Sequence, residues 1–457
     1  MSKNNLPKHL TKGGPGDKYL GDGKVDTSGW FQDVDILENQ IKNEEIWFCT
    51  APFQLIYTTT KGEWQPCSWA KEDPDGPTVH NTSLENWFVH NKDMNKLRKE
   101  MTTPGSDLSL AKKWCNACMK QEELYGRSRR QTSLKIQTND SGLWPSIRDA
   151  VERFKKTGKG RIQDRCFEIQ IKAFGNKCNL DCYMCMPYDS SVRTNTILEE
   201  SALEEQDVFD NVAKRNAREY ISLKDQGMES VIDQIVAISP YIYNLKLIGG
   251  EPLVMKQFYT LLEKVVASGH SKGMQVKYQT NMSILNFEKL KITNYIPEFE
   301  RFEFTVSLDG VGDYNDYIRR RANWQDIENN IRTVKQFPNV VVNINGTISF
   351  LSILRFYKLI DWFDENKDLF DQINWFNIRN PERLQANVLP EELKERLLPL
   401  YKNFPDIQNI LKESNNGIDY KHAINYLLLM DKRYEGTKWE MHLFDVFPEL
   451  KDYYNEN

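Results

Sequence analysis

The chain has 457 residues, of which 40% are hydrophobic and 12% aromatic, enough for one large core plus a smaller module, and this excludes general disorder. Lys and Arg number 60 against 65 for Asp and Glu, and a net charge of −5 gives no strong nucleic-acid signal. The sequence has no run of 18 apolar residues and no apolar secretory segment near its start, so we expect no membrane span and a cytoplasmic protein. In that reducing compartment, its eight cysteines are expected to be metal ligands rather than disulfides.

The first third of the chain divides into three predicted segments. Residues 1–44 form a polar tail rich in Gly and Lys, which we expect to be flexible. Residues 45–130 form a cysteine-bearing module, and residues 131–164 carry few apolar positions, which predicts a surface linker. The basic cluster Arg127–Arg130 could bind phosphate or a substrate backbone, but a solvated face is the simpler interpretation.

The module carries two pairs of cysteines, Cys49 with Cys67 and Cys115 with Cys118. Four thiolates complete the ligand set of one zinc ion or of one [4Fe–4S] cluster. Without other context zinc is the simpler choice, so both metals stay open at this point.

From residue 165 to residue 380 the pattern changes to strands that alternate with helices. Strands are predicted at 167–171, 244–248, 275–280, 302–308, 340–348 and 373–378, and helices at 230–238, 256–267, 324–337 and 351–363. This alternation predicts an α/β fold with a parallel sheet, open or partly closed into a barrel. Residues 381–457 turn helical, at 392–401 and 418–430, and are expected to cap the barrel.

Three cysteines, Cys178, Cys182 and Cys185, lie on the loop directly after the first of these strands. Thiolates hold iron–sulfur clusters, which ordinarily take four of them, so three leave one iron without a protein ligand. An open metal position is how a protein reserves a site for a substrate or cofactor. The alternative is a structural zinc site with Cys166 or a histidine as fourth ligand, but the carboxyl end of a barrel strand favours chemistry.

The triplet resembles the signature loop of radical S-adenosylmethionine (SAM) enzymes. The resemblance continues at the end of the second strand, where Gly249, Gly250, Glu251 and Pro252 are similar to the family's motif that grips the amino group of SAM. Two glycines let the backbone approach closely, and a carboxylate suits an ammonium group. The resemblance implies a partial (β/α)6 TIM-like barrel, with a [4Fe–4S] cluster and SAM as cofactors.

Further SAM contacts are implied at the ends of the next strands. Asn281 ends the third strand, where relatives present polar groups to SAM. Ser307 ends the fourth strand and Arg319 follows it, and in similar enzymes the matching residues meet the SAM carboxylate. Met184 stands where the family usually has an aromatic residue near adenine, and methionine is adaptable enough to fill that gap.

The N-terminal cysteines resemble the twitch module, a shortened form of the SPASM extension of radical SAM enzymes, which binds one auxiliary [4Fe–4S] cluster. The resemblance rests on twelve residues between Cys49 and Gly62, four between Gly62 and Cys67, and the later pair Cys115 and Cys118. It implies iron rather than zinc, in a cluster suited to electron transfer or structure. Relatives usually carry this module after the barrel, whereas here it comes first.

The family resemblance also implies the reaction. SAM would be cleaved reductively at the central cluster, and a 5′-deoxyadenosyl radical would abstract a substrate hydrogen, with a reducing partner such as flavodoxin or ferredoxin. Relatives with twitch or SPASM modules often modify peptides or proteins, so a peptide or protein side chain is the expected substrate and a nucleotide, sugar or amino acid the alternative. A non-catalytic zinc-binding interaction module is the competing hypothesis, and it leaves the motifs at Gly249–Pro252 and Ser307–Gly310 unexplained.

Overall fold

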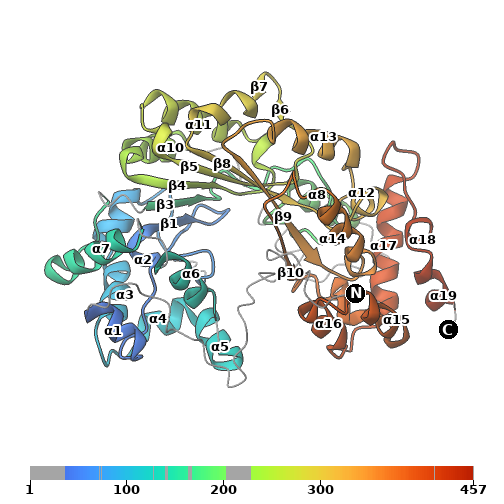
Figure 1. Cartoon of the computed structure of the whole chain (residues 1–457), viewed down its shortest axis with the longest axis horizontal. Helices are drawn as coiled ribbons and strands as arrows, with labels where there is room; N and C mark the ends of the chain where they lie inside the picture. The colour runs from blue at the N-terminus through green and yellow to red at the C-terminus, as the bar shows by residue number, and fades with distance from the viewer. Residues whose placement is uncertain are drawn as a thin grey trace.

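The structure is a computed structural model. It describes residues 36–71, 73, 75–126, 128–138, 143–162, 167–201, 228–415 and 417–455. An eight-stranded sheet runs through these residues in the strand order β10-β9-β8-β5-β4-β3-β1-β2 (Figure 1). Its strands are β1 Leu55–Thr58, β2 Trp64–Gln65, β3 Phe167–Ile171, β4 Ile242–Leu247, β5 Gln275–Thr280, β8 Arg301–Ser307, β9 Val340–Ile348 and β10 Gln372–Asn377. A separate ribbon pairs β6 Asn286–Phe287 with β7 Leu290–Lys291.

The α/β fold with a mostly parallel central sheet is confirmed. All six strands predicted between residues 165 and 380 are present, as β3, β4, β5, β8, β9 and β10. Neighbouring strands of the sheet run parallel, except for the antiparallel pair of β1 and β2. The sheet begins at β10 and ends at β2, so among the described strands it is open rather than a complete barrel.

The two faces of the sheet differ in polarity, as the alternating strand pattern predicts. On β8 the side chains of Phe302, Phe304 and Val306 are buried, whereas Glu303 and Thr305 between them are only half-buried. The apolar outer face packs against helices that include α10 Met228–Ala237, α11 Lys256–Ala267 and α13 Trp324–Val334 (Figure 1). The inner face, by contrast, is polar.

The remaining helices of this part follow the predicted order. They are α8 Ser191–Ser201, α12 Asp313–Ile318 and α14 Phe356–Glu365, followed by the C-terminal helices α15 Glu391–Leu397, α16 Pro405–Lys412, α17 Tyr420–Tyr434, α18 Leu443–Val446 and α19 Glu449–Asn455. The C-terminal region is therefore helical, as expected. Helix α17 reaches the loop that bears the central cysteines, because the hydroxyl of Tyr426 donates to the carbonyl oxygen of Tyr183 at 2.9 Å.

The N-terminal region is more ordered than the sequence suggested. Its helices are α1 Ile36–Lys42, α2 Ala51–Gln54, α3 Lys92–Thr102, α4 Ser109–Trp114, α5 Asn116–Tyr125, α6 Arg129–Thr138 and α7 Leu143–Thr157. The stretch 131–164, expected to be a linker, thus contains most of α6 and all of α7. Helix α1 falls within the stretch expected to be a flexible tail, and residues 1–35 lie outside the described residues.

Helix α7 explains why the linker prediction was wrong. Its few apolar residues, Trp144, Ile147, Val151 and Phe154, repeat every three or four positions and are buried. They form a second hydrophobic core with side chains that include Leu37 of α1. The many polar residues of this stretch cover the outer side of the helix, so a low apolar content concealed an amphipathic pattern.

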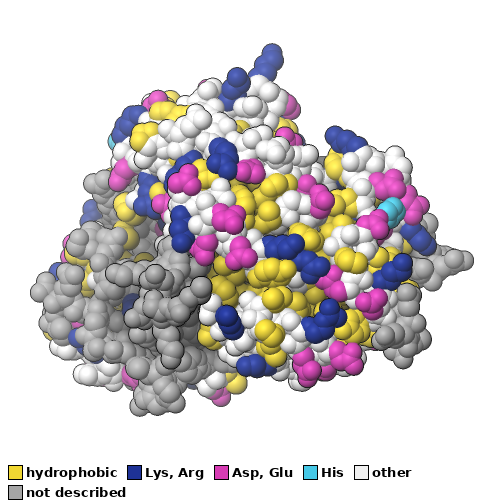
Figure 2. Space-filling model, turned by 45° about the vertical axis from the view of Figure 1, so that its right-hand side comes forward, with side chains coloured by type: hydrophobic (Ala, Val, Ile, Leu, Met, Phe, Trp, Pro, Cys, Tyr) yellow, Lys and Arg dark blue, Asp and Glu magenta, His cyan; other side chains and the backbone are white. Residues whose placement is uncertain are grey.

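Two general features remain, one of the surface and one of the helices. On the face in Figure 2, acidic and basic side chains are interspersed and hydrophobic side chains lie among them. Within the described ranges, every helix is too short or too polar to cross a membrane.

Candidate active site

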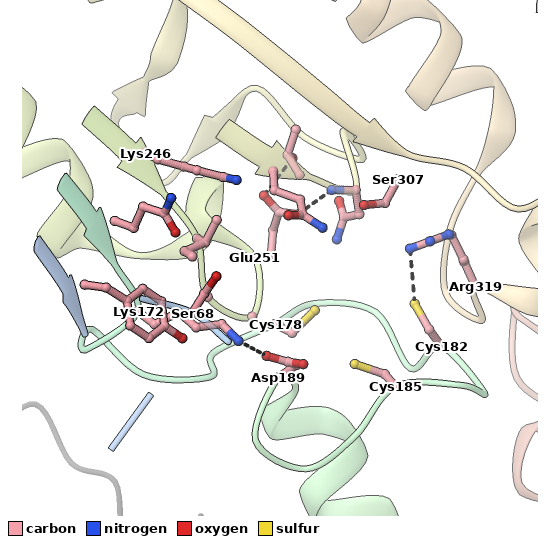
Figure 3. Close-up of a pocket in the computed structure, with 18 of the residues that line it drawn as sticks. Ser68, Lys172, Cys178, Cys182, Cys185, Asp189, Lys246, Glu251, Ser307 and Arg319 are labelled. Atoms are coloured by element: carbon pink, nitrogen blue, oxygen red, sulfur yellow. Dashed lines mark hydrogen bonds and ion pairs between the residues drawn. The ribbon is translucent and has the colours of Figure 1, made fainter. Parts of the chain in front are cut away.

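A cavity of about 390 Å³ lies at the inner face of the sheet, where the strands β3, β4, β5 and β8 end (Figure 3). The carboxyl ends of parallel strands are where such sheets place their ligands. Of the eleven residues predicted for the central cluster and SAM, nine line it: Cys178, Cys182, Cys185, Gly249, Gly250, Glu251, Asn281, Ser307 and Arg319. Two do not, since Pro252 is buried in the turn that follows Glu251 and Met184 packs against the hydrophobic core.

The loop with the central cysteines is held by backbone hydrogen bonds to the segment after α12. The amide of Asp181 donates to the carbonyl of Arg320 at 2.9 Å, and the amide of Tyr183 donates to the carbonyl of Ile318 at 3.1 Å. From behind, the buried guanidinium of Arg193 donates to the carbonyl oxygen of Cys182 at 2.7 Å. These bonds fix the loop conformation that turns the thiols of the triplet toward the cavity.

Two side chains inside the triplet point into the protein and were missed by the sequence analysis. The carboxylate of Asp181 accepts from the hydroxyl of Tyr434 at 2.7 Å and forms a buried ion pair with Arg193 at 3.2 Å. The hydroxyl of Tyr183 accepts from Arg320 at 2.6 Å, and its ring is fully buried. Tyr183 therefore braces the loop instead of lining the cavity.

The thiols of the triplet are buried beside negative charges, which disfavours their ionised form unless a cation is bound. Burial, and then the charges of Cys182 and Glu251, raise the pKa of Cys178 to about 12. Burial, and then the charges of Asp189 and its two partner cysteines, raise the pKa of Cys185 as well. A bound cationic metal centre offsets this cost, because thiolates are the form that ligates metal. The donor set fits an iron–sulfur cluster.

Gly250 lies where the end of β4 meets the cysteine loop. A Cβ atom at this position would be 2.3 Å from the carbonyl oxygens of both Asn176 and Lys177, so only glycine fits. The next amide, that of Glu251, donates to the carbonyl of Lys177 at 2.7 Å. This close approach places the carboxylate of Glu251 beside the triplet.

Glu251 is a buried carboxylate held by three donors. It accepts hydrogen bonds from the amide of Leu253 at 3.0 Å, the hydroxyl of Thr280 at 2.8 Å and the amide of Asn281 at 2.6 Å. Burial outweighs these bonds and raises the pKa of Glu251 to about 7. A neighbouring ammonium group would favour its ionised form, which suits the role expected of this residue.

Arg319 is buried at the other end of the cavity. Its guanidinium pairs with Asp309 at 2.7 Å and lies 3.9 Å from the sulfur of Cys182. The Nε atom of Arg319 is buried without a hydrogen-bond partner among the described residues, so the guanidinium has a donor to spare for an anionic ligand. Ser307 lines the cavity on the same side (Figure 3).

The N-terminal cysteines converge although they lie far apart in the sequence. Cys49 and Cys67 flank the hairpin of β1 and β2, whose turn contains Gly62 at a φ of +81°. Burial, and then the charges of Cys49, Cys67 and Cys118, raise the pKa of Cys115, so the thiols are near enough to influence one another electrostatically. Across the described ranges, no three His, Cys, Asp or Glu side chains are arranged as a metal-ion site, so the metal at either site stays a prediction.

The basic cluster 127–130 is not simply a solvated face. Arg130 forms an ion pair with Glu122 at 2.8 Å and donates to the carbonyl of Phe48 at 2.6 Å, which ties α6 to the cysteine module. Arg129 lines the cavity. Arg127 lies outside the described residues.

Charged residues on the inner face of the sheet also line the cavity and were missed. Lys172, directly after β3, forms an ion pair with Asp189 at 2.7 Å, and Lys246 lies on β4 (Figure 3). Both lysines alternate with buried apolar neighbours, as in Leu245-Lys246-Leu247. This alternation was the signal that could have placed them on the inner face.

Comparisons with known proteins relate one part of the chain to a known family. Residues 173–348, less than half of the chain, match the family described as the Radical SAM superfamily. This match supports a radical SAM domain in that part of the chain, and with it an enzyme. No curated protein matches the sequence.

Solved structures resemble parts of the chain at low identity. Native anSMEcpe with bound AdoMet is 16% identical, with a TM-score of 0.35, over 52% of this chain and 61% of that one. Streptococcus suis SuiB bound to S-adenosylmethionine is 14% identical, with a TM-score of 0.32, over 65% of this chain and 57% of that one. SuiB bound to the precursor peptide SuiA is 15% identical, with a TM-score of 0.32, over 73% and 64%. The chain thus matches less than two thirds of the length of each.

Proposed function

We propose that the chain cleaves SAM reductively at a [4Fe–4S] cluster held by Cys178, Cys182 and Cys185, and abstracts a substrate hydrogen with the resulting radical. The observation that carries this proposal is the meeting of three thiols from one loop, the buried carboxylate of Glu251 and the buried guanidinium of Arg319 at one cavity. The match of this part of the chain to the Radical SAM superfamily supports it.

Each group at the cavity has a role in this proposal. When bound, the cluster supplies the electron that breaks a carbon–sulfur bond of SAM and yields the 5′-deoxyadenosyl radical. Glu251 binds the amino group of SAM, and the free Nε of Arg319 binds the carboxylate together with Ser307. The chain's own contribution is to hold SAM and the substrate carbon in a fixed relation and to keep water away from them.

For the N-terminal cysteines we propose an auxiliary [4Fe–4S] cluster in a twitch-like module. The charges of Cys49, Cys67 and Cys118 all raise the pKa of Cys115, which supports one shared set of four ligands. Such a cluster suits electron transfer or structure. Zinc remains the alternative metal for the same four ligands.

The substrate that we propose is a peptide or protein side chain, as for the twitch and SPASM proteins that the N-terminal cysteines resemble. A small molecule such as a nucleotide, sugar or amino acid is the second candidate. Cytoplasmic location and a flavodoxin or ferredoxin as reducing partner belong to the same proposal.

Anaerobic reconstitution tests the proposal. Iron and sulfide are counted, the protein is reduced with dithionite, and 5′-deoxyadenosine is measured by chromatography. We expect about eight irons per chain, because two [4Fe–4S] clusters are proposed, and cleavage of SAM. A variant with Cys178→Ala, Cys182→Ala and Cys185→Ala is the control, and its activity should vanish. Zinc without iron, and no cleavage, would overturn the proposal.

A further inference from the structure

The cavity has two chemically different ends. Figure 3 shows Ser307 and Arg319 at one side of the cavity and Lys246 and Lys172 at the other, with Glu251 between them. The first side is the one proposed to hold the SAM carboxylate. The N-terminal module also contributes to the wall of the cavity, through Ser68, Trp69 and Arg129.

Lys246 is the central residue of this second side. It lies half-buried on the inner face of the sheet, in register with Gln170 of β3 and Lys277 of β5. Lys277 has an acidic partner, Glu303, at 3.5 Å. Lys246 has no ion pair among the described residues, so of two lysines in one row only Lys277 has its charge compensated.

Arg129 brings a second charge of the same sign to Lys246. Its guanidinium comes from α6 of the N-terminal module and lines the same cavity. The two cations are close enough for the charge of Arg129 to help burial lower the pKa of Lys246, although the acids Glu168 and Glu303 oppose it. Arg129 also has no ion pair within the residues that the structure describes.

Trp69 places this pair of cations at the junction of the two ends of the sheet. The Arg129 guanidinium lies 5.6 Å from the centre of the Trp69 ring, and that of Arg379, which follows β10, lies 5.9 Å from it. Strand β10 is the far end of the sheet from β1, so Trp69 of the N-terminal module meets a residue from the opposite end of the sheet. Arg379 adds a third positive charge near the same rim.

The acids at this side of the cavity offset these cations only in part, since Glu168 and Glu303 are the two that act on Lys246 and neither forms an ion pair with it among the described residues. Lys172 is already neutralised by Asp189 at 2.7 Å. Glu303 is shared between Lys277 at 3.5 Å and Arg301 at 3.8 Å. Lys246 is half-buried and Arg129 is exposed at the cavity wall. A half-buried cation without an ion-pair partner is costly, and a second cation beside it raises that cost, so this side of the cavity is suited to an anion.

We propose that Lys246 and Arg129 bind an anionic oxygen group of the substrate, a carboxylate or a phosphate, at the end of the cavity away from Arg319. The inference rests on the proposed function only in taking this cavity as the active site. Lysine from the sheet and arginine from α6 would then fix the substrate against the cysteine triplet, so that two separate parts of the chain complete the binding site.

Binding of two probe anions tests this inference. Inorganic phosphate and succinate are each titrated by calorimetry into the reconstituted, SAM-saturated protein, and the affinity for SAM is measured separately. Variants are Lys246→Met and Arg129→Gln, with Lys246→Arg to restore the charge. The control is Lys264→Met, which removes an exposed lysine of α11 that pairs with Asp233 away from the cavity.

We expect at least one anion to bind, and its affinity to fall about tenfold in Lys246→Met and in Arg129→Gln, as for the loss of one charge-assisted hydrogen bond. Lys246→Arg should retain most of the affinity, and Lys264→Met all of it. A preference for phosphate indicates a phosphorylated substrate, and a preference for succinate a carboxylate.

Three results would overturn the inference. They are binding of neither anion, binding that the Lys246 and Arg129 variants leave unchanged, and a loss of SAM affinity parallel to the loss of anion affinity, which would assign the cations to SAM itself. Cleavage of SAM is assayed in the same preparations. If the wild type does not cleave SAM but the anion results are as expected, the proposed function fails while the anion site stands.

Discussion

The two sets of cysteines offer the same ligand chemistry and are buried to a similar degree, but they differ in sequence spacing and in their relation to the cavity. The central triplet lies within eight residues of one loop and lines the cavity. The N-terminal four come from segments more than sixty residues apart, as Cys49 and Cys115 illustrate, and none of them lines that cavity. The first set, called the open set, leaves one iron position for a cofactor in the proposed function. The second, called the enclosed set because it lies away from the cavity, is proposed to serve structure or electron transfer.

The two sites nevertheless share one structural device. Arg193 donates to the carbonyl oxygen of Cys182 at 2.7 Å, and Arg130 donates to the carbonyl oxygen of Phe48, directly before Cys49, at 2.6 Å. Both arginines also pair with an acid of their own region. In each case a largely buried guanidinium fixes the backbone beside a cysteine, and this is independent of whether the site is open or closed.

The largest expected effect comes from breaking the open set. Cys185→Ala should abolish SAM cleavage, with a loss of more than about a hundredfold, because two thiolates do not hold a SAM-binding cubane. Electron paramagnetic resonance of the reduced protein should lose the signal that changes when SAM is added. A Cys185→Ala protein that still responds to SAM would show that the triplet is not the cofactor site.

Removing the brace behind the open set should have the next largest effect. Arg193→Met leaves the carboxylate of Asp181 buried without its cation, which costs about 3–5 kcal/mol of unfolding free energy. Urea denaturation measures this cost, and iron loss during gel filtration should accelerate with it. The control is Arg332→Met, which breaks a largely exposed pair with Glu328 and should cost less than about 0.5 kcal/mol.

The pKa of Glu251 predicts a smaller, pH-dependent effect on the open set. Burial raises this pKa to about 7, and the SAM amino group favours the ionised carboxylate. Between pH 6 and pH 7.5 the ionised fraction, and with it the affinity for SAM, should rise about eightfold. Equilibrium dialysis measures the affinity.

Glu251→Gln is the control for this pH dependence. The variant should bind SAM more weakly than the wild type and show no rise over the same range. Without SAM the sign is reversed, because between pH 4.5 and 7 the folded chain holds a proton that the unfolded chain has released, so stability falls as pH rises. An equal rise in the variant would assign the titration to another group.

Sequence reasoning was most successful where pattern and position coincided. The six strands follow from the alternation of apolar residues, and Gly250 was singled out by its place after β4, where the structure leaves no room for a Cβ atom. These features are local, so the residues that define them are neighbours in the sequence.

Features that depend on long-range contacts were not predictable. Arg320 and Asp431 form a buried pair at 2.7 Å across more than a hundred residues, and neither belongs to a motif. Arg129 lines the cavity, and the N-terminal region that carries it joins the sheet through the pairing of β1 with β3. The pattern of apolar residues along the sequence does not predict that pairing. Helix α7 was missed for a different reason, since its amphipathic pattern is present in the sequence but was outweighed by its polar composition.

The smallest expected effect is the one that tests the comparison most directly. Cys115→Ala removes one ligand of the enclosed set and should lower the iron content by about half, as one of two [4Fe–4S] clusters is lost. Cleavage of SAM by chemically reduced protein should change by less than about twofold, because none of the enclosed cysteines lines the cavity. The rate of turnover with a protein electron donor is measured in the same samples. A loss of that rate alone would assign electron transfer to the enclosed set. Loss of chemically driven cleavage as well would contradict the independence of the two sites. Ser68 and Trp69 would explain that result, because they follow Cys67 directly and form part of the cavity wall.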